Sequence, residues 1–147
     1  INPNETYTRA ETDKKAETWM ALYAKAEEGV QTVLAAQAAQ KKVVATLESG
    51  GASAALKDQG IVVDELCQEF ISSMVATGTT LVQIISEPTK PLSMLVTLHN
   101  IQEHTEGPPN QPWREVYAKV AGEMDTSMSA FRAALETEIA RFDDLTN

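Results

Sequence analysis

The chain has 147 residues, 43% of them hydrophobic but only 5% aromatic, and 12 basic against 21 acidic side chains give a net charge of −9. Nucleic-acid binding is excluded because it needs clustered Lys and Arg to displace phosphate counterions. Cys67 is alone, which excludes a disulfide scaffold, and no stretch has the roughly 18 unbroken apolar residues of a membrane span. We therefore expect one acidic, all-α domain over 1–147, with residues 1–11 extending the first helix or frayed.

The first predicted helix covers about 12–48. Residues on one face follow one another there in steps of three and four, as on an amphipathic helix. Ser49, Gly50 and Gly51 then end the segment. The expected core face consists of Ala16, Trp19, Tyr23, Ala26, Val30, Val33, Gln37, Gln40, Val44 and Leu47.

Three further helices are predicted, over about 61–86, 91–105 and 112–145. Residues 49–60 are rich in Gly and Ala, which predicts a loop with at most one helical turn. Pro88 and Pro91 separate the second helix from the third, since each proline disfavours a helical conformation at the residue before it. Gly107, Pro108 and Pro109 separate the third helix from the fourth.

Four amphipathic helices predict a bundle, in which each apolar face is covered by neighbours. If the chain turns back at Pro88–Pro91, the result is an antiparallel up-down four-helix bundle with long first and last helices. Those two helices are then antiparallel neighbours, with Trp19 and Tyr23 near residues 131–142. If the chain only kinks there, the second and third helices form one rod of a three-helix bundle, and the aromatic residues gather at one end. The pattern favours the first arrangement and leaves the second open.

Chemistry-bearing constellations are sparse. His99 and His104 are five positions apart and do not share a helix face, while His99 and Glu103 are spaced for two metal ligands where a site needs more. Cys67 has no cationic neighbour within a helical turn, which predicts a small buried apolar side chain. No phosphate-binding glycine loop or nucleophile motif occurs. We therefore expect a non-enzymatic protein without catalytic, cofactor-binding or metal-binding residues.

The favoured function is a scaffold or adaptor that mediates protein–protein association or self-association, with coiled-coil-like helix pairing. Amides on a core face cost stability unless they are bonded, so Gln37 and Gln40 are expected at the rim of the bundle or paired across a homodimer. With the adjacent Lys41 and Lys42 they form the predicted interaction surface.

Two alternatives stay open. One is an extracytoplasmic ligand-sensing four-helix domain of a membrane receptor, with Arg114, Lys119 and Arg132 as ligand contacts. The other is a carrier of a small apolar ligand held between helices. Because the chain begins at Ile1 rather than Met, an extracytoplasmic location remains open beside the favoured cytoplasmic one. Neither nucleic acid nor direct membrane insertion is expected.

Overall fold

The computed structural model describes residues 7–76 and 90–147. Its regular structure is helical throughout this part of the chain, which confirms the predicted all-α bundle. The helices are α1 (Arg9–Glu48), α2 (Ala54–Met74), α4 (Pro91–Glu103) and α5 (Gln111–Thr146). The predicted second helix is wrong at 75–76, since Val75 is extended and α2 ends at Met74, and its predicted continuation over 77–86 lies outside the described residues. Among those described, no helix combines the length and the apolarity needed to cross a bilayer.

Local capping explains where the helices begin. Thr8 and Glu11 form a capping box, in which each side chain accepts a hydrogen bond from the other residue's backbone N–H, so α1 begins earlier than predicted. The Ser53 side chain caps α2 by accepting from the Leu56 N–H, which turns most of the expected 49–60 loop into helix. Asn110 caps α5 in the same way.

The first and last helices run parallel. Lys25 on α1 bonds to Asp125 on α5, Lys42 bonds to Asp143, and the two partners are separated by 100 and 101 positions respectively. Because the number of sequence positions between the paired residues stays nearly the same along the two helices, both helices must run in the same direction. The up-down-up-down arrangement, with antiparallel first and last helices and Trp19 near residues 131–142, is therefore replaced by the alternative three-rod arrangement.

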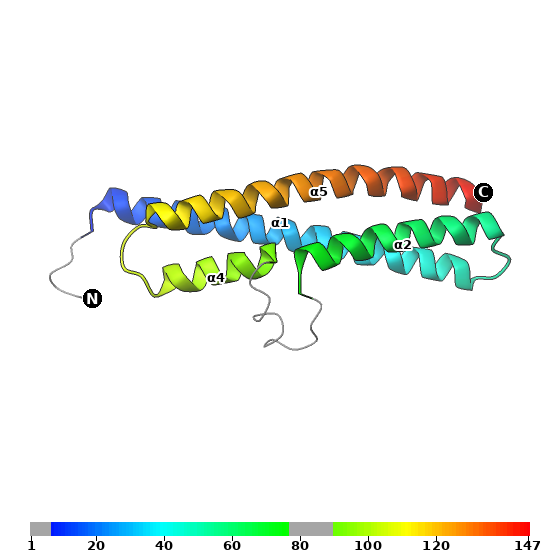
Figure 1. Cartoon of the computed structure of the whole chain (residues 1–147), viewed down its shortest axis with the longest axis horizontal. Coiled ribbons are helices and arrows are strands. Elements are labelled where there is room, and N and C mark those ends of the chain that lie inside the picture. Colours follow the sequence, from blue (N-terminus) through cyan, green and yellow to red (C-terminus); the bar gives the residue numbers. More distant parts are fainter. Residues whose placement is uncertain (1–6, 77–89) are drawn as a thin grey trace.

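The third rod consists of α2 and α4, which lie end to end and point the same way (Figure 1). Their 21 and 13 residues together nearly match the 36 residues of α5 and the 40 of α1. A reversal between them would leave half of each long helix without cover, which is the physical reason for the tandem arrangement. At the junction, Lys90 Nζ donates to the Ser72 carbonyl near the C-terminus of α2, at 2.7 Å.

All four helices meet at Gly29 of α1. A Cβ atom placed there would lie 2.8 Å from Met124 Cε on α5, 3.0 Å from Leu92 Cδ2 on α4 and 3.4 Å from Met74 Cε on α2. The missing side chain therefore lets the end of one half-rod, the start of the other and α5 approach the α1 backbone together.

The buried face of α1 differs from the expected one. The expected Ala26, Val33, Gln40 and Leu47 do lie at or beside the core, but Tyr23, Val30, Gln37 and Val44 are exposed. Their places are taken by Leu22, Gly29, Ala36 and Val43, each one position earlier in the chain. Gly29 and Ala36 are small because the neighbouring helices approach closely there, and a hydrophobic pattern does not weigh glycine or alanine as core, whereas Leu22 and Val43 are ordinary apolar core residues.

The tryptophans and tyrosines gather toward the α4 end of the bundle. Trp113 Nε1 donates to the Leu98 carbonyl at 2.9 Å and its ring stacks on Tyr117. A Cβ on Gly107 would lie 2.6 Å from the Tyr7 ring, so this tyrosine also lies against the α4–α5 turn.

The phenylalanines are placed differently, since Phe70 stacks on Phe131 between α2 and α5 and Phe142 lies beside Gly60 toward the opposite end. The three-rod alternative predicted that the aromatic residues gather at one end, which holds for the tryptophans and tyrosines and is wrong for the phenylalanines.

Substitutions at two helical glycines test the junction. Gly29→Leu should lower the free energy of unfolding by about 1–3 kcal/mol, because it forces a side chain between packed helices. Gly122→Leu on α5 is the matched control, since a Cβ there meets nothing within 4 Å, and it should raise stability by about 0.5–1 kcal/mol through helix propensity. Urea unfolding followed by circular dichroism measures both changes. Equal effects of the two substitutions would contradict the close approach at Gly29.

Candidate functional site

The side of α1 away from the core carries large apolar side chains. Met20, Tyr23, Val30, Leu34 and Val44 are between 46% and 72% exposed. They recur in steps of three and four or their multiples, so they lie on one stripe of the helix. We call this stripe the outer face; its members are Met20, Tyr23, Glu27, Val30, Leu34, Gln37, Lys41 and Val44. A continuous exposed stripe of this kind is typical of an interaction surface.

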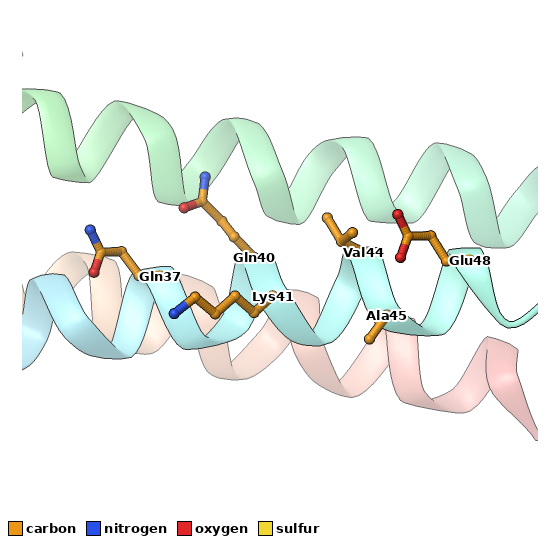
Figure 2. A pocket seen from close by; sticks show the side chains of 6 residues that line it. All are labelled: Gln37, Gln40, Lys41, Val44, Ala45 and Glu48. Atoms are coloured by element: carbon orange, nitrogen blue, oxygen red, sulfur yellow. The ribbon is translucent and has the colours of Figure 1, made fainter.

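A shallow hollow lies over the C-terminal part of this face. It is lined only by α1 residues, namely Gln37, Gln40, Lys41, Val44, Ala45 and Glu48. Figure 2 shows Gln40 reaching toward α2, whereas Lys41 extends along the open side of α1. The hollow therefore combines apolar wall atoms with amide and charged groups at its edge.

The structure divides the predicted interaction surface. Gln40 Nε2 donates to Asp64 Oδ1 at 2.9 Å and to Gln68 Oε1 at 3.3 Å, which joins α1 to α2. Lys42 pairs with Asp143 at 2.6 Å, which joins α1 to α5 on the opposite flank. Gln37 and Lys41 are exposed, and neither has a hydrogen-bond or ion-pair partner within 7–76 and 90–147. Two of the four residues thus hold the bundle together, and two face outward.

The predicted ligand contacts of the receptor-domain alternative do not converge. Arg114 Nη1 donates to the Pro109 carbonyl at 3.0 Å, and Arg132 Nη2 donates to Thr32 Oγ1 at 2.9 Å beside Glu28. At 1.5 Å per residue, Arg114 and Arg132 are about 27 Å apart along α5. Lys119 borders a separate shallow hollow that also includes Pro91.

Comparisons with known protein families, with curated protein sequences and with solved structures found no match. The functional argument therefore rests on the geometry of this chain.

Aromatic and titratable side chains form a cluster between the N-terminal part of α1 and α4. A hydrogen bond of 3.3 Å joins Tyr23 Oη and His99 Nδ1, and the Trp19 ring meets His99 edge-on at 5.1 Å. His99 Nε2 lies 3.8 Å from Glu103, the expected partner at i+4. The described residues contain no group of three or more side chains suited to a metal ion. Sequence spacing did not reveal this cluster, because Tyr23 and His99 are 76 positions apart.

Lys25 links α1 to α5 beneath the outer face. Its ammonium group pairs with Asp125 and, at 3.1 Å, with Glu28, and its side chain is only 17% exposed. The hydrogen bond to Asp125 is the main cause that raises the pKa of Lys25 above its ordinary value of 10.5, against the opposing effect of burial.

This raised pKa predicts a pH dependence. Since the folded pKa exceeds the unfolded one, the pair stabilises the fold below pH 10.5 and loses its contribution as the pH rises through the folded pKa. Wild-type stability should therefore fall more steeply above that pH than the stability of Lys25→Met, in denaturant titrations. Lys57→Met, which removes an exposed lysine of α2, is the control and should keep the wild-type slope. Identical slopes for all three proteins would refute the role of Lys25.

Cys67 is fully buried, as predicted. Burial, with a smaller effect of Asp64, raises the pKa of its thiol from 9.0 to about 11. Because the thiolate is the reactive form, alkylation by iodoacetamide near neutral pH should be at least about 100-fold slower in the folded protein than in denaturant. Equal rates measured by mass spectrometry would contradict the burial of Cys67.

Proposed function

We propose that the protein is a non-catalytic interaction module, and that the outer face of α1 is the surface to which a protein partner binds. The observation that carries this proposal is the run of half-exposed apolar side chains from Met20 to Val44 on one helix. This proposal keeps the scaffold or adaptor function expected from the sequence, and the rotation of α1, which leaves these side chains exposed, supports the outer face as its contact surface.

The energetics of this surface suit reversible association. Full burial of a large aliphatic side chain contributes about 1.5–3 kcal/mol, so burying the remaining exposed half contributes about 1 kcal/mol. Five such side chains supply on the order of 5 kcal/mol, before the cost of losing free motion on binding. This amount supports micromolar affinity only if polar contacts at the rim and a good fit add to it. Glu27, Gln37 and Lys41 offer such contacts.

Charge separates α1 from the rest of the chain. It carries six basic and six acidic residues, so it is neutral, and the remaining residues carry six basic and fifteen acidic ones. The net charge of −9 therefore lies outside α1. A partner that approaches the outer face meets a helix without net charge, whereas the negative charge of the rest of the chain repels acidic proteins.

The two alternative functions receive less support. A ligand-sensing domain was expected to use Arg114, Lys119 and Arg132, which lie apart and are partly engaged within the bundle. A carrier needs an apolar cavity between helices, whereas large side chains fill the centre of the described bundle, among them Met74, Met124, Met128 and Phe142.

Site-specific photocross-linking tests the proposed surface. A benzophenone side chain at Leu34 should give protein adducts when the full chain is irradiated in extract of its own cells. The same group at Ser129, an exposed position on α5, is the control and should give few. Equal labelling from both positions, or none from either, would contradict the proposal.

A further inference from the structure

Building on the proposed function, we infer that the partner is a second copy of this chain, held by antiparallel pairing of the two outer faces. A two-fold axis that passes between the two copies of α1, at the level of Thr32, brings each residue of the outer face opposite a complementary residue of the second copy. The facing pairs are Val30 with Leu34 of the second copy, Glu27 with Gln37, Tyr23 with Lys41, and Met20 with Val44. Each pair occurs twice because the interface is symmetric.

The chemistry of these pairs is matched. Apolar side chains meet apolar ones at the Val30–Leu34 and Met20–Val44 levels, and the Tyr23 ring meets the Lys41 ammonium, a cation–π arrangement. Glu27 faces the amide of Gln37 and lies about one helical turn from Lys41 of the second copy. Lys41, which has no partner within the described residues, thus gains both a ring and a carboxylate.

Other pairings of the same face are unfavourable. A parallel pair would place Glu27 against Glu27 and Lys41 against Lys41, so that like charges meet across the interface. Sliding the antiparallel pair by seven residues would place Val30 against Lys41, or Met20 against Gln37. In both registers a polar side chain is buried against an apolar one and has no hydrogen-bond or ion-pair partner. The charge pattern therefore selects one direction and one register.

Small residues flank the outer face on its open side. Ala24, Ala38 and Ala45 follow Tyr23, Gln37 and Val44 in the chain, and all three are exposed. In the antiparallel register Ala24 lies about 3 Å along the axis from the level of Ala38 of the second copy, and Gln31 lies about 3 Å from the level of its own counterpart. Alanines at these places let the two backbones approach without steric conflict.

The neighbouring helices extend the apolar surface. Ile61 lies one turn before Asp64, the residue that accepts from Gln40, and Val96 lies one turn before His99, the residue bonded to Tyr23. Their exposed fractions are 55% and 53%. Residues on these turns of α2 and α4 share the flank that adjoins α1, so Ile61 and Val96 edge the surface that the second copy covers.

The area fits a reversible dimer. Pairing over residues 16–48 covers about 50 Å of helix, and at a width of about 10 Å this gives a footprint near 500 Å² a copy. The total of about 1,000 Å² lies at the lower limit for specific interfaces. We therefore expect dissociation in the micromolar range rather than an obligate dimer.

Disulfide trapping tests direction and register. When Ala24→Cys and Ala38→Cys proteins are mixed and oxidised, the mixed disulfide should dominate, because these positions lie within about 3 Å of the same level along the axis. Either variant alone should cross-link little, since its two thiols would be about 20 Å apart along the axis. Homodisulfides of Ala24→Cys forming as readily as the mixed species would overturn the antiparallel register. Cys67 is buried, so its thiol is not expected to form disulfides in this experiment.

Sedimentation equilibrium tests the occupant. The wild-type chain should change from monomer to dimer over the micromolar range, and Leu34→Glu should weaken the dimer at least tenfold. Ser129→Glu adds the same charge on α5 and should keep the wild-type constant, while circular dichroism verifies that all three are folded. A wild-type chain that stays monomeric at about 1 mM would overturn the self-association. If Leu34 adducts then contain a different protein, the proposed function stands and this inference alone fails.

Discussion

The close approach at Gly29 is the constraint on which the arrangement depends. At this point α1 has no side chain, and the end of α2, the start of α4 and the middle of α5 all meet its backbone through Met74, Leu92 and Met124. Because the contact is made by side chains from three helices, it fixes where the two half-rods abut and how α1 is rotated. A larger residue would separate the half-rods from α1 and open the middle of the bundle.

The rotation of α1 decides which of its two stripes is buried. The helix carries two overlapping series of residues spaced by three and four, one containing Gly29 and Ala36, the other containing Val30 and Leu34. A shift of one position turns a residue by about 100° around the axis. The bundle covers the series that contains Gly29 and Ala36, since the helices pack closest there, and the series that contains Val30 and Leu34 remains on the surface as the outer face.

Much of the fold follows from the sequence, and the reasons for the remainder are physical. Periodicity and the Gly and Pro breaks predict the four helices, but the sequence favoured a reversal at Pro88–Pro91, which the parallel directions of α1 and α5 exclude. The predicted core face of α1 was wrong at Val30, because hydrophobic patterns favour the larger side chain whereas close packing buries the smaller Gly29. Gln37, Gln40, Lys41 and Lys42 were predicted together as one interaction surface. The contacts of Gln40 with α2 and of Lys42 with α5 could not be predicted, because they depend on helices distant in the sequence.

The central claim is that one face of α1 is closed by the bundle and that the adjacent outer face pairs with a second copy of the chain. Methyl NMR spectra recorded over a concentration series test this most directly, because Val43 is buried in the bundle and its chain neighbour Val44 is exposed on the outer face. The account predicts that the methyl signals of Val44 and Leu34 shift as the concentration rises, while those of Val43 and Val33 stay in place. Signals of the inner pair that shift as much as those of the outer pair, or outer signals that never move, would contradict it.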